Sequence, residues 1–225
     1  MTSRARGGDY YGKLKIVEDI LIPHTHFVRA VSRLKAVIDL TRQRAEPRHT
    51  LLVGESGTGK TWLARYVQSL YPSHCKDGST VMPVLLVETP AKPSLKGLAE
   101  AILVALGDPF ADKGTITTKR KRALGLIERC QVELIVLDEF QHFLDHGIFD
   151  SMNAVSDWLK LFIEDVKIPF MLMGLPRCAA ILQMNEQLRR RFSCRLELPR
   201  LSIDSEEGEI EFRTVLNQID KSLFR

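Results

Sequence analysis

The segment GESGTGKT at residues 54–61 combines glycines, a lysine and a threonine in the spacing G-x-x-x-x-G-K-[ST]. It lies between the apolar run LLV and a helical pattern, which is the context that a phosphate-binding loop needs. The glycines let the backbone curl so that its N–H groups face phosphate oxygens, and the next helix adds its positive N-terminal end. We expect Lys60 to neutralise the β and γ phosphates of a nucleoside triphosphate and Thr61 to hold Mg²⁺.

The segment LIVLDEF at residues 134–140 places two carboxylates directly after four apolar residues. A buried strand would deliver Asp138 and Glu139 to its carboxyl end, where ligands of α/β proteins bind. We expect Asp138 to bind Mg²⁺, directly or through water, and Glu139 to polarise the attacking water as general base. Nucleotide kinases lack this acidic pair, so the sequence favours hydrolysis over phosphoryl transfer to a small acceptor.

Polar residues beside these motifs have two interpretations each. Thr89, just past the second predicted strand, either holds Glu139 inactive until a partner arrives or is an ordinary strand end, and Glu88 competes for the first role. Gln141 and His142 either report the nucleotide state or cap a loop. The predicted nucleotide-binding residues are Gly54, Glu55, Ser56, Gly57, Thr58, Gly59, Lys60, Thr61, Trp62, Asp138 and Gln141.

Three adjacent arginines, Arg189, Arg190 and Arg191, precede Phe192 and a predicted strand. Such a run is either solvated surface or the source of an arginine finger that reaches the γ-phosphate bound by a neighbouring subunit. A finger accelerates hydrolysis by about 10³–10⁵ in some NTPases. We favour the finger, with Arg191 as the first candidate.

Short apolar runs that alternate with helical periodicity must position these residues. Continuous apolar strands of this kind form a parallel sheet that is covered by helices on both faces, so the predicted fold class is α/β. Ser94 is the expected N-cap of one helix. The predicted strands are 50–53, 81–87, 134–137, 170–173 and 195–198, and the predicted helices are 27–44, 61–70, 94–106, 119–130, 150–166, 177–184 and 204–224.

Composition narrows the class of protein. The 225 residues are 44% hydrophobic, enough for one sizeable domain, and no apolar stretch approaches the roughly 20 residues that cross a bilayer. The basic N-terminus has no apolar run behind it, so we expect no signal peptide. Four scattered cysteines without a CxxC pair argue against zinc and disulfides and favour a cytoplasmic location. The net charge of +4 permits nucleic acid as a partner without requiring it.

The sequence resembles the AAA+ ATPases of transposons called TniB or TnsC. The segments that carry the resemblance are GESGTGKT, PVLLVETPAKPSLKGLAEAILVALGDP at 83–109, LIVLDEFQHF at 134–143 and LRRRFSCRLELP at 188–199. The first motif and the acidic pair are shared by all AAA+ proteins. The stretch at 83–109 and the QH after the acidic pair point to the transposon family, over roughly residues 25–200.

The resemblance implies an AAA+ P-loop NTPase fold with a five-stranded parallel sheet. Such proteins bind ATP and Mg²⁺ and assemble with themselves on double-stranded DNA as rings or helical filaments, with about a hexamer per turn. They link a target-selector protein to the transposase. The nucleotide would lie between subunits, with Lys60, Thr61, Asp138 and Glu139 from one and the arginine finger from the next. The implied domains are an N-terminal arm at 1–26, a core at 27–200 and the start of a helical lid at 201–225.

Two departures from the family pattern qualify these expectations. The fourth predicted strand ends FMLMGLP, without the Asn, Ser or Thr that AAA+ proteins usually carry there as a sensor. Hydrolysis is therefore expected to be slow and regulated by partners, or the sensing passes to Gln141 or His142. Only one helix of the lid is expected before Arg225, so the lid is either minimal or incomplete through truncation, which we favour.

Assembly on DNA requires phosphate neutralisation more than base readout. The best candidate is TITTKRKR at 115–122, which supplies hydroxyl donors and four cations, although most charge runs are solvated helix faces. On this basis a double Lys119/Lys121→Glu change should weaken DNA binding without affecting folding. The predicted DNA-binding residues are Lys92, Lys96, Thr115, Lys119, Arg120 and Lys121.

Two other functions fit the same motifs. A helicase loader or replication initiator would use this fold with a helicase partner. A nucleotide-gated DNA scaffold with little hydrolysis would be compatible with the missing polar sensor.

Overall fold

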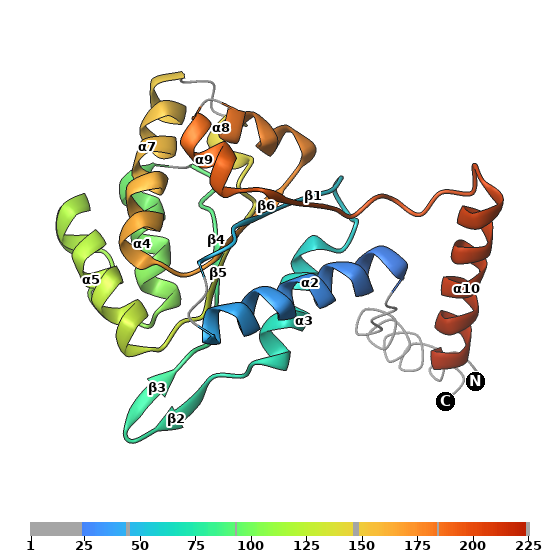
Figure 1. Ribbon diagram of the computed structural model, residues 1–225, viewed down its shortest axis with the longest axis horizontal. Coiled ribbons are helices and arrows are strands. Elements are labelled where there is room, and N and C mark those ends of the chain that lie inside the picture. The colour runs from blue at the N-terminus through green and yellow to red at the C-terminus, as the bar shows by residue number, and fades with distance from the viewer. Residues whose placement is uncertain (1–23, 44–45, 93, 146–148, 184, 224–225) are drawn as a thin grey trace, which may run out of the picture. The chain divides into compact units, whose positions relative to one another are not determined.

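The computed structural model describes residues 24–43, 46–92, 94–145, 149–183 and 185–223 (Figure 1). Residues 29–199 form one compact unit, and residues 200–223 with 24–28 form another. The expected N-terminal arm, 1–26, lies outside the described residues except at its end. There the first described helix, α2 (Thr25–Arg42), starts two residues before the predicted 27.

Five parallel strands form the sheet of the larger unit, as the sequence predicted. Their order is β4-β5-β6-β1-β7, so the first strand in the chain lies inside the sheet. The loop after β1 and the acidic pair at the end of β5 are therefore separated by one strand, β6. The strands are β1 (Thr50–Val53), β4 (Val84–Glu88), β5 (Leu134–Asp138), β6 (Phe170–Gly174) and β7 (Cys194–Glu197).

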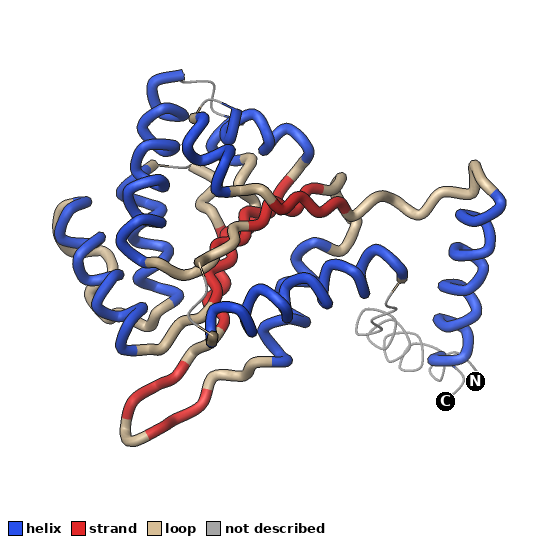
Figure 2. The backbone as a smooth tube through the Cα atoms, in the orientation of Figure 1, coloured by secondary structure: helices blue, strands red, loops and turns tan. Residues whose placement is uncertain are grey.

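Helices cover both faces of this sheet (Figure 1). On one face lie α2 and α3 (Lys60–Leu70), and on the other lie α4 (Leu95–Ala105), α5 (Ile116–Arg129) and α7 (Phe149–Val166). In Figure 2 the red strands of the five-stranded sheet run between these two groups of helices. Because strand side chains alternate, one set packs with α4, α5 and α7. This set comprises Leu51, Leu85, Val87, Ile135, Leu137, Phe170 and Leu172.

The sequence did not predict the β2–β3 hairpin or the short helices α6 and α9. The predicted strand 81–87 is interrupted at Pro83. Its first residue, Val81, is instead the last residue of a hairpin formed by β2 (His74–Lys76) and β3 (Ser79–Val81). Asp77 and Gly78 form its turn with φ of 51° and 74°, as an Asp-Gly hairpin turn requires. The short helix α9 (Glu186–Arg191) is capped by Asn185, whose carboxamide oxygen accepts the N–H groups of Gln187 and Leu188.

Three further short elements follow the strand ends: α6 (His142–Asp145), the 3₁₀ turn η1 (Pro176–Cys178) and α8 (Ala179–Gln183). The smaller unit contains α10 (Glu206–Leu223), within the predicted helix 204–224. Its Glu211 carboxylate accepts the Thr25 backbone N–H at 2.9 Å. Among the described helices, none combines the length and the apolar character that crossing a membrane requires.

Candidate nucleotide-binding site

The loop between β1 and α3 has a backbone that its glycines make possible. Gly57 and Gly59 have φ of 81° and 87°, in the left-handed region that favours glycine. Gly54 is needed for space, because a Cβ there would lie 2.6 Å from both Leu198 O and Thr58 Oγ1. The loop therefore curls tightly at the carboxyl end of β1 and leads directly into α3.

Lys60 is held inside this loop. Its side chain is 7% exposed, and Nζ donates to Gly54 O and Glu55 O, both at 2.8 Å. Thr58 Oγ1 also donates to Glu55 O, at 2.9 Å. An ammonium therefore lies at the base of the loop, where the phosphates of a nucleotide would bind.

Thr61 and Asp138 meet across the gap between α3 and β5. Thr61 Oγ1 donates to Asp138 Oδ2 at 2.7 Å, and the Glu139 backbone N–H donates to Asp138 Oδ1 at 2.8 Å. Burial raises the pKa of the Asp138 carboxyl, which is 3% exposed, although the hydrogen bond from Thr61 opposes this shift. A hydroxyl and a buried carboxylate side by side fit Mg²⁺, which prefers oxygen ligands and would also stabilise the buried negative charge.

Both predicted halves of the site face one cavity of about 260 Å³. Glu139 enters it from a backbone with φ of 55°. Of the predicted nucleotide-binding residues, Gly54, Glu55, Thr58 and Asp138 do not line this cavity, and Leu175, which was not predicted, lines it. The lining residues are Ser56, Gly57, Gly59, Lys60, Thr61, Trp62, Glu139, Gln141 and Leu175.

The polar residues beside the acidic pair have distinct surroundings. Thr89 is 1% exposed, its N–H donates to Asp138 O at 3.0 Å, and its hydroxyl has no hydrogen-bond partner within the described chain. Glu88 is exposed. His142 Nδ1 lies 3.0 Å from Thr89 O, whereas Gln141 contacts Glu139 directly. Thr89 is thus buried beside the Asp138 backbone, whereas Glu88 lies opposite Asp138 in the sheet and is exposed.

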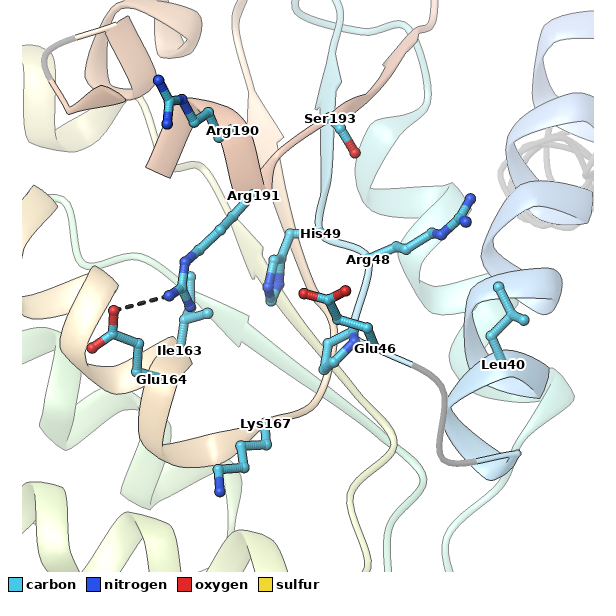
Figure 3. Close-up of a pocket in the computed structure, with 11 residues that line it drawn as sticks. Leu40, Glu46, Arg48, His49, Ile163, Glu164, Lys167, Arg190, Arg191 and Ser193 are labelled. Atoms are coloured by element: carbon cyan, nitrogen blue, oxygen red, sulfur yellow. Dashed lines mark hydrogen bonds and ion pairs between the residues drawn. The ribbon is translucent and has the colours of Figure 1, made fainter. Parts of the chain in front are cut away.

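The three arginines lie away from this cavity, at the end of α9. Arg191 pairs with the Glu164 carboxylate at 2.9 Å and lines a second cavity of about 900 Å³ with His49 (Figure 3). His49 and Ser193 directly precede β1 and β7, so this cavity lies at the amino ends of the strands. Lys60 follows the carboxyl end of β1, so Arg191 and Lys60 of one chain lie toward opposite edges of the sheet. Arg189 and Arg190 both pair with Glu186.

His49 in the second cavity is a buried histidine that does not carry charge at neutral pH. It is 4% exposed, and its Nδ1 accepts the Phe170 backbone N–H at 3.1 Å, so the neutral ring carries its proton on Nε2. Burial, and secondarily the positive charge of Arg191, lower the pKa of His49 from 6.5 to about 4.

This shift predicts a loss of stability in acid. Because the folded-state pKa is lower, the unfolded chain binds more protons between pH 6.5 and about 4. The contribution of His49 to stability is therefore complete above pH 6.5 and is lost as the pH falls through this window, by up to about 3 kcal/mol. The free energy of urea unfolding should be measured at pH 7 and at pH 5. Between these two pH values we expect His49→Asn, whose side-chain oxygen can accept the same N–H, to lose less of it than wild type. An equal loss in both proteins would contradict this assignment.

The predicted DNA-binding run at 115–122 requires a correction. Lys119 is fully buried: Nζ donates to Ala111 O and pairs with the Glu100 carboxylate at 2.9 Å. The prediction that Lys119 contacts DNA is therefore wrong. A Lys119/Lys121→Glu change would also disturb folding, because it would bury a carboxylate beside Glu100.

The neighbours of Lys119 in this run are also engaged in the fold. Arg120 pairs with the Asp165 carboxylate and donates to Leu161 O at 2.9 Å. Thr115 caps α5, accepting the Thr118 N–H at 3.2 Å. These contacts fasten α5 to its surroundings. The predicted DNA-binding lysines whose side chains remain exposed are Lys92, Lys96 and Lys121.

Solved structures with the same fold include ORC1 and ORC2 proteins and Cdc6p. The Aeropyrum pernix ORC1 protein in complex with DNA matches with 20% identity and a TM-score of 0.63, over 91% of this chain and 51% of that chain. The A. pernix ORC2 protein in its ADP form matches with 20% identity and a TM-score of 0.65, over 92% and 56%. Cdc6p from Pyrobaculum aerophilum matches with 16% identity and a TM-score of 0.63, over 92% and 53%. The chain thus spans about half the length of these proteins, and the likeness shows the AAA+ fold.

A search of curated proteins found no significant match. The family model described as Bacterial TniB protein matches residues 13–202, which is most of the chain and agrees with the resemblance found in the sequence. The chain therefore belongs to the TniB family of AAA+ ATPases.

Proposed function

We propose that this chain is an ATP- and Mg²⁺-dependent regulator of transposition that assembles on double-stranded DNA and links a target-selector protein to the transposase. The observation that carries the ATPase part is the single cavity lined by Lys60, Thr61 and Glu139. Membership of the TniB family supports the role in transposition.

The residues around the cavity would divide the work of hydrolysis. The loop N–H groups and Lys60 bind and neutralise the phosphates, and Thr61 and Asp138 hold Mg²⁺. Bound there, Mg²⁺ supplies positive charge to the phosphate oxygens. Glu139 accepts a hydrogen bond from the attacking water and takes its proton as the water attacks.

The position of Arg191 supports catalysis between copies of the chain. It lies at the amino edge of the sheet, whereas Lys60 follows the carboxyl end of β1. Stacking copies with one edge against the other would bring Arg191 of one copy to the nucleotide of the next. In the single chain the Arg191 guanidinium pairs with the Glu164 carboxylate, so a nucleotide phosphate bound by the neighbouring copy would have to replace that carboxylate.

DNA contact is assigned to the exposed lysines at the start of α4. Lys92 lies in the loop after β4, and Lys96 lies in the first turn of α4. Lys121 on α5 is a third exposed candidate for DNA contact.

The hydrocarbon side chain of Leu175, directly after β6, favours slow turnover. A nucleotide-gated scaffold with little hydrolysis is therefore the second candidate function.

Electron microscopy of the protein with duplex DNA and a non-hydrolysable ATP analogue tests the proposal. We expect rings or filaments that require both DNA and nucleotide. A Lys92/Lys96→Glu variant should bind duplex DNA at least about tenfold more weakly at 0.1 M salt, with a shallower salt dependence.

The matched control for this variant is Lys35/Lys76→Glu, which makes the same change of charge at exposed lysines on α2 and the hairpin. Equal weakening in both variants would show that only net charge matters and would reject the assigned surface. Particles that stay monomeric with DNA and nucleotide would reject the assembly.

A further inference from the structure

The end of β6 reaches the nucleotide cavity without a polar side chain of its own. Gly174 ends the strand, and Leu175, the next residue, lines the cavity with a hydrocarbon side chain. The carboxamide of Gln141 reaches this position from the neighbouring strand end. Gln141 is 5% exposed and lines the same cavity.

The carboxamide of Gln141 joins Glu139 to the backbone beyond β6. Its Oε1 accepts the Leu175 N–H at 3.2 Å and lies 3.7 Å from Cys178 Sγ, and its Nε2 donates to Glu139 Oε2. Turning the amide over would set its NH₂ against the Leu175 N–H and its oxygen against the Glu139 carboxylate. The Leu175 N–H therefore determines which end of the amide faces Glu139.

Gly174 provides the space that this arrangement needs. A Cβ at Gly174 would overlap Gln141 Oε1 and Cys178 Sγ, and it would lie 3.3 Å from Gln141 N. The φ of Gly174 is not positive, so steric room rather than backbone conformation requires glycine here. The missing side chain at the end of β6 and the amide from β5 are thus two parts of one arrangement.

We propose that Gln141 is a positioning residue for Glu139, which substitutes for a polar side chain at the end of β6 by holding one carboxylate oxygen and leaving the other for the attacking water. This inference rests on the proposed function, in which Glu139 is the base. The Gln141 amide acts through Glu139, so its loss slows the chemical step far more than it weakens nucleotide binding.

The test compares Gln141→Ala with wild type in the presence of Mg²⁺ and duplex DNA. We expect kcat for phosphate release to fall by up to about 100-fold, the cost of a misplaced catalytic group. The Kd for a fluorescent ATP analogue should change far less than kcat, and the midpoint of thermal unfolding should fall only modestly, because the Leu175 N–H loses its acceptor. Gly174→Ala should reproduce the loss, whereas Gly125→Ala, whose added Cβ meets no atom within 4 Å, should not.

A rescue distinguishes positioning from a merely structural role. Adding Leu175→Asn to Gln141→Ala puts an amide back beside the cavity from the end of β6, and we expect it to recover part of kcat. Wild-type kcat in Gln141→Ala, or a loss confined to nucleotide binding, would overturn the inference. In either case the proposed function would still stand if Glu139→Gln abolishes turnover, and full turnover in Glu139→Gln would overturn both.

Discussion

Replacing Glu139 with glutamine is expected to lower ATP turnover by about 100-fold or more while nucleotide binding persists. The carboxylate that takes the proton from the attacking water is lost, and general-base catalysis typically contributes 10²–10⁴-fold. Lys60, Thr61 and Asp138 are unchanged, so the phosphates and Mg²⁺ keep their proposed ligands. The variant should therefore accumulate in an ATP-bound assembly on DNA.

Phosphate release and binding of a fluorescent ATP analogue, each measured with and without DNA, check this result. Glu88→Gln is the matched control, because Glu88 lies opposite Asp138 in the sheet register but is exposed. The control should hydrolyse ATP like wild type. Unchanged turnover in Glu139→Gln would show that another group activates the water.

Replacing Arg191 with alanine is expected to lower turnover in the assembled state by about 10³-fold, the lower end of the range for arginine fingers. The assembly would lose the guanidinium that stabilises charge on the phosphate of the neighbouring copy. Arg190→Ala is the matched control, since Arg190 lies on the same helix and pairs with Glu186 on the surface. It should retain most of the activity.

Mixing variants tests whether Arg191 acts between copies. Arg191→Ala chains keep an intact loop, and Lys60→Ala chains keep an intact arginine, so a mixed assembly contains some complete sites. Two inactive proteins should therefore recover part of the turnover when they are combined on DNA. No recovery in assemblies that electron microscopy shows to be mixed would argue that Arg191 acts in its own chain or not at all.

The phosphate-binding loop could be predicted because the residues that determine its conformation are consecutive in the chain. The loop conformation depends on glycines at 57 and 59 within eight consecutive residues, and short apolar runs predict the strands. The parallel sheet was predictable because runs without polar alternation must be buried on both faces. The contact of Thr61 with Asp138 follows because the first turn of α3, after β1, and the end of β5 both lie at the carboxyl side of one sheet.

The predictions that failed concern charged residues whose partners are distant in the chain. Lys119 lies in a run of four cations, which on a helix is usually a solvated face. It is buried because Glu100 on α4 and the carbonyl of Ala111 meet its ammonium. Helical spacing does distinguish the two lysines, because Lys119 lies four residues before Ala123 and shares its buried face of α5, whereas Lys121 lies off that face and is exposed.

The sequence by itself determined the fold class, the family and the phosphate-binding loop, since each depends on residue types within short segments. Only the tertiary structure decided which cations pair with carboxylates of the same chain. It also decided that Arg191 and Lys60 of one chain lie toward opposite ends of the strands, and that the Gln141 carboxamide occupies the space beside Gly174. These facts depend on strand order and packing, which bring together residues such as Lys119 with Glu100 and Gln141 with Leu175, 19 and 34 positions apart in the chain. Spacing along the chain does not predict such contacts. The packing around a side chain and the pairing of a buried charge depend on which residues the completed fold places next to it.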